Sequence, residues 1–254
     1  MKLKVDKINK AFINHKVEHK VLEDISIDAK EGEFISLLGP SGCGKTTLLT
    51  IIGGFTKADS GDIFLDGKKV DKPGVDRAFI FQNYALFPWK TVKANVEFPM
   101  KQLKVPKDER EKRVKELLQM SNLEGKENVY PNDLSGGMKQ RVALIRALAC
   151  NPKVLLMDEP LGAVDYQMRQ NLQEELENIW LKNEITAIMV THDVDEAVYL
   201  SDRVIVMSRD RGKIIENLKI ELDRPRNRES MEYNSYKKML TTKLSECYID
   251  NKTE

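Results

Sequence analysis

Gly39-Pro40-Ser41-Gly42-Cys43-Gly44-Lys45-Thr46-Thr47 is a glycine-rich loop that ends in Gly-Lys-Thr-Thr. It fits the pattern G-x-x-x-x-G-K-[ST], in which glycines let the backbone wrap its N–H groups around phosphate oxygens and the lysine adds a positive charge. Residues 33–38 before it have the composition of a buried strand, and residues 46–52 after it have the pattern of a helix. The loop therefore precedes the positive N-terminus of a helix, and we predict that it binds phosphate groups.

The composition limits the kinds of protein that this chain can be. Its 254 residues are enough for one large α/β domain, alone or with a smaller appended lobe. Lys and Arg total 41 against 40 Asp and Glu, a formal charge of +1, so a basic face for nucleic acid is not expected. Cys43, Cys150 and Cys247 are too scattered for a disulfide framework or a zinc site, and they favour a reducing compartment. No apolar run reaches the ~18 residues of a membrane span, so we expect the chain not to cross a membrane.

Short strand-like segments surround the phosphate-binding loop, at residues 3–8, 21–27 and 61–70. They predict a small mixed or antiparallel sheet beside the core, with a polar hairpin loop at residues 14–20. Phe12 lies in the first connection, where its ring could stack on an adenine or pack in the core. The residues alone leave both alternatives open.

A strand predicted at residues 77–81 is followed by Gln82, the first residue of a loop. A strand-end amide beside a phosphate site could orient a water molecule or bind a metal ion, and it could equally cap a turn. The loop that follows, residues 83–89, is unusually apolar for an exposed connection. It predicts either a buried lid or a surface that binds a partner.

Residues 154–157 are consecutive apolar residues, which indicate a strand buried on both faces in a parallel sheet. Asp158 and Glu159 follow at its carboxyl end, the edge where ligands bind in open α/β sheets. We predict that Asp158 holds Mg²⁺ through its water ligands and that Glu159 polarises an attacking water. A strand predicted at residues 185–190 leads in the same way to His192, either part of this site or an ordinary surface histidine.

Residues 91–149 are charged and follow helical periodicity, which predicts an inserted helical lobe. Its last helix opens at Leu134-Ser135-Gly136-Gly137, a turn that is either a second anion site or a plain N-cap. Asp165 is predicted to cap a helix at residues 166–180. The chain after residue 223 is polar and predicts a solvated peripheral tail.

In order and spacing, these motifs resemble those of the ATP-binding cassette (ABC) ATPases: Gly39 to Thr46, Gln82, Leu134 to Gln140, Val154 to Glu159, Asp165 and His192. The resemblance covers about residues 12–228. It implies an α/β fold, a P-loop NTPase core with a mainly parallel sheet, an N-terminal antiparallel β subdomain and an inserted helical subdomain at about 91–150. The ABC-type ATP-binding domain would span residues 1–228, and residues 229–254 would form a C-terminal tail, expected to be helical.

The resemblance also implies a role in binding ATP and Mg²⁺ for each motif residue. Lys45 would contact the β- and γ-phosphates, while Thr46 and Gln82 would bind Mg²⁺ and Asp158 would hold the magnesium waters. Phe12 would stack on the adenine. The remaining nucleotide contacts would come from the phosphate-binding loop: Gly39, Pro40, Ser41, Gly42, Cys43, Gly44 and Thr47.

Hydrolysis is implied to need both this chain and a second subunit. Glu159 would activate the nucleophilic water and His192 would contact the γ-phosphate. Ser135, Gly136 and Gly137 would reach the γ-phosphate bound by the opposite subunit, and Asp165 would lie across the dimer seam. No single chain would then contain a complete site.

Within the family, residues 81–92 and 191–197 look like those of the nitrate, sulfonate, taurine and bicarbonate importer group. This implies an ATPase subunit of a membrane importer for a small anion or sulfonate, as a homodimer or paired with a related ATPase subunit. Its other partners would be integral membrane permease subunits and, indirectly, a solute-binding protein, and it would lie at the cytoplasmic face of the cell membrane. The alternatives are the ATPase subunit of an exporter and a soluble ABC ATPase without a transport role; no nucleic-acid partner is expected.

Overall fold

The structure is a computed structural model that describes residues 1–14, 16–162 and 166–249. The chain divides into two compact units, which are described separately. Unit 1 comprises Met1–Gly74 and Thr186–Glu254, and unit 2 comprises Val75–Ile185.

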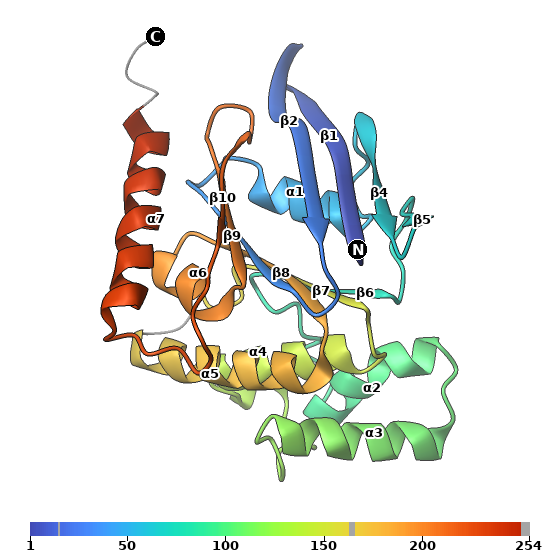
Figure 1. Cartoon of the computed structure of the whole chain (residues 1–254). Helices are drawn as coiled ribbons and strands as arrows, with labels where there is room; N and C mark the ends of the chain where they lie inside the picture. The colour runs from blue at the N-terminus through green and yellow to red at the C-terminus, as the bar shows by residue number, and fades with distance from the viewer. Residues whose placement is uncertain (15, 163–165, 250–254) are drawn as a thin grey trace. The chain divides into compact units, whose positions relative to one another are not determined.

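Unit 1 contains an antiparallel sheet with the strand order β2-β1-β4-β5 (Figure 1). The strands are β1 (Leu3–Asn14), β2 (Val17–Ala29), β4 (Ser60–Leu65) and β5 (Lys68–Lys69). Asp66 and Gly67 join β4 to β5 with φ angles of 50° and 73°, as the mirror-image turns of tight hairpins require. The predicted antiparallel sheet at the N-terminus is therefore confirmed.

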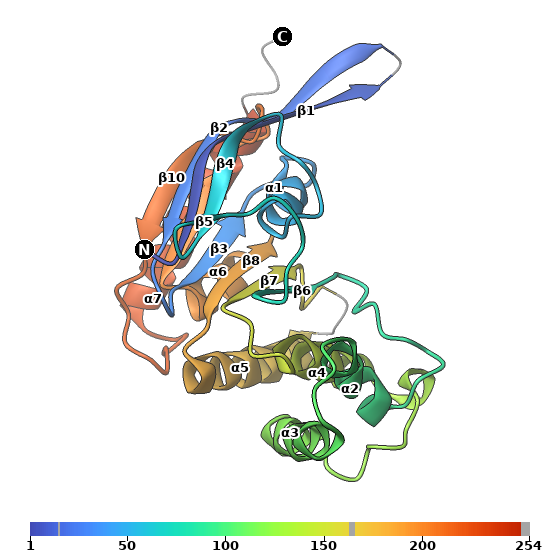
Figure 2. The same ribbon diagram turned by 90° about the vertical axis from the view of Figure 1, so that its right-hand side faces the viewer.

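β1 and β2 are longer than the sequence pattern predicted. Their pairing continues through Phe12 opposite His19 and Asn14 opposite Val17, so the prediction of a loop from Asn14 to Lys20 is wrong. Figure 2 shows these paired ends extending beyond β4. The side chains of Ile13 and Val17 are exposed here. Both are β-branched, and such side chains favour an extended backbone.

A second sheet in unit 1 carries the strand order β10-β9-β3-β8. β3 pairs in parallel with β8 and β9, while β10 is antiparallel to β9. Every residue of β3 and β8 is buried, as their apolar sequences predict. The strands are β3 (Phe34–Leu38), β8 (Thr186–Thr191), β9 (Arg203–Met207) and β10 (Ile214–Lys219).

The helices of unit 1 pack on this second sheet. α1 contacts β8, α6 contacts β3 and β8, and α7 contacts α6 and β9. The helices are α1 (Lys45–Ile52), α6 (Val194–Leu200) and α7 (Met231–Ile249).

Unit 2 combines two parallel strands with helices. Ile80 at the end of β6 pairs with Met157 in β7. α4 packs against β6 and α2, and α2 contacts α3. The elements are β6 (Arg77–Ile80), α2 (Val92–Gln102), α3 (Lys107–Met120), the short 3-10 helix η1 (Pro131–Asp133), α4 (Gly136–Leu148), β7 (Val154–Asp158) and α5 (Tyr166–Asn183). Parallel strands, an antiparallel sheet and helices together confirm the α/β fold class.

The C-terminal segment is not the solvated tail that its polar sequence predicted. α7 buries Tyr233, Leu240 and Cys247, with exposed fractions of 0%, 0% and 3%. These residues are seven apart and therefore lie on one face of the helix. Within residues 1–14, 16–162 and 166–249, no helix is long and apolar enough to cross a membrane.

Candidate nucleotide-binding site

The phosphate-binding loop joins β3 to α1 within unit 1. Lys45, the first residue of α1, is only 5% exposed, and its ammonium donates to the carbonyl oxygens of Gly39 and Pro40 at 2.8 and 2.9 Å. The loop therefore holds a positive charge at its centre. A phosphate oxygen is a stronger acceptor for this ammonium than a carbonyl oxygen, so an incoming phosphate would compete for it.

Glycine is needed in this loop for both its conformation and its size. Gly42 and Gly44 have φ angles of 81° and 97°, in the left-handed region that favours glycine. At Gly39, an added Cβ would lie 2.6 Å from the carbonyl oxygen of Met207. Gly44 is also the N-cap of α1 and offers no side chain to the first-turn N–H groups, which suits them to bind an anion.

Cys43 belongs to the interior of the loop. Its side chain is 2% exposed, and its sulfur lies 3.8 Å from the Lys45 ammonium. Burial raises the pKa of the thiol, with Lys45 partly opposing the shift. The thiol therefore stays protonated near neutral pH and fills space under the loop.

His192 emerges beside the phosphate-binding loop within unit 1. Leu38, the residue before Gly39, pairs in parallel with Thr191, the residue before His192. The Thr191 hydroxyl donates to Glu196 at 2.6 Å and accepts from the backbone N–H of Asp193 at 3.0 Å. Asp193 in turn accepts from Asp195 N–H at 2.7 Å, at the start of α6. The backbone that carries His192 is thus fixed on both sides, and the prediction that His192 directly follows a strand is confirmed.

Gln82 and Glu159 meet within unit 2. They follow the parallel strands β6 and β7, and the Gln82 amide nitrogen donates to a Glu159 carboxylate oxygen at 3.2 Å. Glu159 has a φ of 44°, which is strained for a residue with a Cβ and is common at functional sites. Asp158 is the last residue of β7 and directly precedes it. The structure brings together the amide and the acidic pair of the predicted water-activating site.

Ser135 is the N-cap of α4, and its hydroxyl accepts from Met138 N–H at 3.3 Å. The N-cap interpretation of Ser135 is therefore confirmed. The residue is nevertheless exposed at the positive end of a 13-residue helix, so the second interpretation, an anion site, stays a prediction.

Phe12 is not a core residue. Its ring is 46% exposed on β1, and the Lys10 ammonium lies 5.2 Å from its centroid. Stacking of this ring on adenine stays a prediction. Asp165, the predicted helix cap and seam residue, lies outside the described residues.

The apolar loop after Gln82 is partly buried and partly exposed. It is therefore neither a wholly buried lid nor a wholly exposed surface for a partner. Tyr84 is buried, while Trp89 is 70% exposed. The Phe87 ring packs at a tilt against Phe98, with centroids 4.6 Å apart, and against Trp89 at 5.7 Å. The Phe87–Phe98 ring pair is therefore the packed base of the loop, and Trp89 lies on it exposed to solvent.

Two polar residues that the sequence analysis did not single out hold this loop. Asn95 is fully buried; its side chain accepts from Phe87 N–H at 2.9 Å and donates to Phe87 O at 3.1 Å. Arg146 donates to the carbonyls of Tyr84 and Ala85 at 2.8 and 2.7 Å. Tyr84 and Ala85 have positive φ angles, 61° and 46°, which these bonds stabilise. The sequence signal that could have identified Asn95 is a polar residue at a helix position that neighbouring apolar residues place on the buried face.

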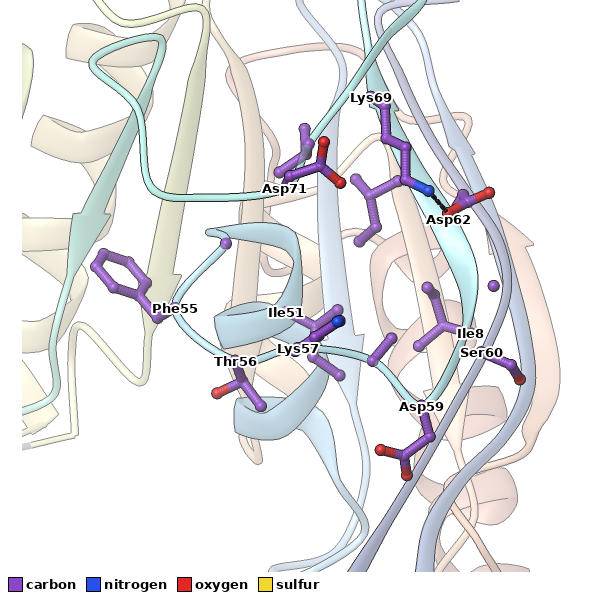
Figure 3. A pocket seen from close by; sticks show the side chains of 15 residues that line it. Ile8, Ile51, Phe55, Thr56, Lys57, Asp59, Ser60, Asp62, Lys69 and Asp71 are labelled. Atoms are coloured by element: carbon purple, nitrogen blue, oxygen red, sulfur yellow. Dashed lines mark ion pairs between the residues drawn. The ribbon is translucent and has the colours of Figure 1, made fainter.

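A cavity of about 450 Å³ in unit 1 is separate from the predicted nucleotide site (Figure 3). It lies between the end of α1 and the β4–β5 hairpin, and none of the predicted nucleotide-site residues lines it. Two of its charged residues, Lys69 and Asp62, form an ion pair of 2.5 Å. The motifs, and not this cavity, therefore define the candidate nucleotide site.

Comparisons with known proteins agree with the motifs. Residues 22–162 match the model of the ABC transporter family. The chain is 43% identical over 240 residues to the aliphatic sulfonates import ATP-binding protein SsuB of Bacillus cereus, covering 94% of each chain. It is also 43% identical to the nitrate import ATP-binding protein NrtD of Synechococcus elongatus, over 90% of this chain and 85% of that protein.

A solved structure of another protein, determined with its nucleotide bound, is also similar to this chain. A dimeric ATP-binding cassette in a post-hydrolysis state, bound to ADP and phosphate, matches with a TM-score of 0.75 and 33% identity, covering 86% of this chain and 99% of that one. The chain therefore belongs to the ABC transporter family and is an ATP-hydrolysing, ATP-binding subunit of the group that contains nitrate and sulfonate import proteins.

Proposed function

We propose that the chain powers a membrane importer for a small anion or sulfonate, by closing as a head-to-tail dimer on ATP and reopening after hydrolysis. The observation that carries the hydrolytic part of the proposal is the 3.2 Å contact between Gln82 and Glu159. It joins a carboxylate able to act as a general base to an amide able to orient it, and a protein that only bound nucleotide would need neither.

ATP would bind through the phosphate-binding loop. Lys45 would exchange the carbonyls of Gly39 and Pro40 for the β- and γ-phosphates, and the N–H groups of the loop and of the first turn of α1 would surround them. Phe12, with its half-exposed ring, would stack on the adenine. The other loop contacts would come from Gly39 to Thr47.

The residues present have the oxygen donors that suit Mg²⁺. They are the hydroxyl of Thr46, the amide oxygen of Gln82 and the carboxylate of Asp158, which would act through water. Because the Gln82 nitrogen faces Glu159, its oxygen is directed away from that carboxylate, as a metal ligand requires. The ion would neutralise charge on the β- and γ-phosphate oxygens.

Hydrolysis would depend on Glu159 and His192. Glu159 would accept a proton from the attacking water while Gln82 keeps its carboxylate in place. His192 would donate to the γ-phosphate from its position beside the phosphate-binding loop. Both groups would act on charge that develops in the transition state, which is where positioned donors and bases accelerate a reaction.

A second subunit would complete each site. Ser135, Gly136 and Gly137 lie at the positive end of α4, where an anion is stabilised, and would contact the γ-phosphate of the partner. Asp165 would lie at the seam. The matching cassette structure is dimeric, which supports this arrangement.

The import role is supported by the similarity to proteins named for sulfonate and nitrate import. Trp89, exposed on a packed base, offers a contact for an integral membrane permease, and a solute-binding protein would deliver the cargo. The chain would then be peripheral, at the cytoplasmic face of the membrane.

Uptake in vesicles tests this proposal. The chain would be reconstituted with the permease whose gene lies beside its own and with the matching binding protein, and labelled nitrate, bicarbonate, taurine and an alkanesulfonate would be offered. ATP-dependent accumulation of one of them, lost with Glu159→Gln, is expected. ATP-dependent efflux with no accumulation would show an exporter instead.

A further inference from the structure

Side chains of the segment that follows β10 contact both ends of helix α6. α6 begins at Val194, two residues after His192, and has only seven residues. Five side chains from residues 224–237 contact its two ends and are called the α6 clasp: Arg224, Arg226, Arg228, Tyr233 and Lys237. In Figure 1, α6 and α7 lie side by side, and they are in contact.

Two arginines of the clasp occupy the C-terminal end of α6. Arg226, which is 5% exposed, donates to the carbonyls of Val198 and Tyr199. Arg224 donates to the carbonyl of Leu200 at 2.8 Å. The last carbonyls of a helix have no partner inside it and carry partial negative charge, so guanidinium groups stabilise this end.

The other three side chains converge on Asp195, in the first turn of α6. Its carboxylate accepts from Arg228, from the Tyr233 hydroxyl at 3.1 Å and from the Lys237 ammonium at 2.8 Å. Tyr233 is fully buried, and its hydroxyl finds acceptors on Asp195 in both the carboxylate and the backbone carbonyl oxygen, the latter at 3.2 Å. The Arg228 guanidinium also lies 3.7 Å from the centroid of the Tyr199 ring.

A helix of seven residues has few hydrogen bonds of its own, because its first four N–H groups and last four C=O groups lack partners within it. The orientation of α6 therefore depends on the groups that bind its two ends. At its start, Thr191 bonds to both Asp193 N–H and Glu196, which ties the backbone of His192 to the first turn of α6. A shift of α6 would be transmitted to His192.

We propose that the α6 clasp positions His192 for ATP hydrolysis, with Asp195 as the positioning residue that links the C-terminal helix to the site. This inference rests on the role proposed above for His192. It assigns to the C-terminal segment a function in turnover that does not require it to touch the nucleotide. Asp195 acts through His192, so its effect should appear in the rate of hydrolysis and not in the affinity for ATP.

A double-mutant cycle in the full-length chain tests the inference. Asp195→Asn keeps the shape of the side chain and removes the charge that holds Arg228 and Lys237. With Mg-ATP we expect kcat to fall about tenfold, within the ~10²-fold loss that a 1 Å misplacement can cause, and KM to stay within about twofold. In a His192→Ala background, Asp195→Asn should cause no further loss, because its effect passes through His192.

Lys237→Met provides a second variant in case Asp195→Asn does not fold, because it removes one contact and keeps the aliphatic stem. It should lower kcat in the same direction, Lys237→Arg should restore it, and the exposed neighbour Lys238→Met is the matched control. Losses that multiply in the double mutant, or unchanged kcat in both Asp195→Asn and Lys237→Met, would overturn the inference. If His192→Ala itself hydrolysed ATP at the normal rate, the role proposed for His192 would fail and the inference with it. If His192→Ala were slow and the clasp variants normal, the clasp alone would be excluded.

Discussion

The amide nitrogen of Gln82 lies 3.2 Å from a carboxylate oxygen of Glu159, although 77 residues separate the two in the sequence. The contact forms because β6 and β7 are parallel neighbours in register, with Ile80 opposite Met157, so both strands end at the same edge. It fixes the orientation of the carboxylate that we propose as the general base.

Lys45→Ala should weaken the binding of Mg-ATP. The buried ammonium would be lost, and a hydrogen bond to a charged group is worth roughly 1.5–3 kcal/mol, which corresponds to a dissociation constant about 10- to 100-fold higher. Calorimetric titration measures it, with Lys57→Ala, an exposed lysine beyond α1, as the control. An unchanged affinity in Lys45→Ala would mean that the loop is not the phosphate site.

Substitutions of Ser135 separate its N-cap role from its proposed contact with the partner's nucleotide. Ser135→Asp keeps a good N-cap acceptor for Met138 N–H but places a negative charge toward a phosphate, so stability should hold while hydrolysis falls. Ser135→Arg should likewise impair hydrolysis, while ATP binding by the same chain stays nearly intact. Melting temperature, ATP affinity and ATPase rate of both variants are the measurements. Normal turnover by Ser135→Asp would leave the residue with a capping role only.

The loop after Gln82 is predicted to separate into an exposed contact and a structural base. Trp89→Ser should leave the melting temperature and the basal ATPase rate nearly unchanged but weaken binding to the permease, because its ring is 70% exposed. Phe87→Ser should lower stability, by less than the roughly 3–5 kcal/mol of a fully buried phenylalanine, because it packs on Phe98 and lies 5.6 Å from Arg146. Co-purification with the permease and thermal denaturation report the two effects. A large loss of stability in Trp89→Ser would instead show that the whole loop is a lid.

Much of the fold and of the candidate site could be predicted from the sequence, because the signals are local. The phosphate-binding loop must contain glycine at Gly42 and Gly44. The apolar runs of β7 and β8 place Asp158 at the end of one buried strand and His192 directly after the other. Local signals could not show which side chains meet across the chain.

The docking of α7 was missed for that reason. Tyr233, Leu240 and Cys247 are separated by mostly polar residues and form one buried face only because they recur at intervals of seven. The contacts of Asp195 with Arg228, Tyr233 and Lys237 join residues more than 30 positions apart, and no local pattern encodes them. The strand pairing beyond Asn9 in β1 likewise joins residues of two strands, such as Phe12 and His19, and the polar composition of residues 14–20 did not reveal it.

Tyr233 should make the protein less stable at alkaline pH. Burial and then the charge of Asp195 raise the pKa of its hydroxyl above the ordinary value of 10.0, and Arg228 partly opposes the shift. Because the pKa of this hydroxyl is higher in the folded state, the hydroxyl contributes its full stabilisation of the fold below pH ~10. This contribution is lost progressively as the pH rises above the pKa of the unfolded state. Above pH ~10, the free energy of unfolding should therefore fall more steeply for the wild type than for Tyr233→Phe, by up to about 1.4 kcal/mol per pH unit. Urea unfolding at pH 8, 10 and 11 measures it; parallel pH profiles would show that the phenol is not held neutral.

The rate of phosphate release by Glu159→Gln tests the central claim most directly. The substitution keeps the size of the side chain and its contact with Gln82 while removing the base, so the Mg-ATPase rate should fall by roughly 10²–10⁴. ATP binding should persist, and the variant should elute as an ATP-bound dimer in gel filtration, while Glu174→Gln, an exposed glutamate in α5, should behave as the wild type. Phosphate release at the wild-type rate from Glu159→Gln would contradict the account, because the base for hydrolysis would then have to lie elsewhere.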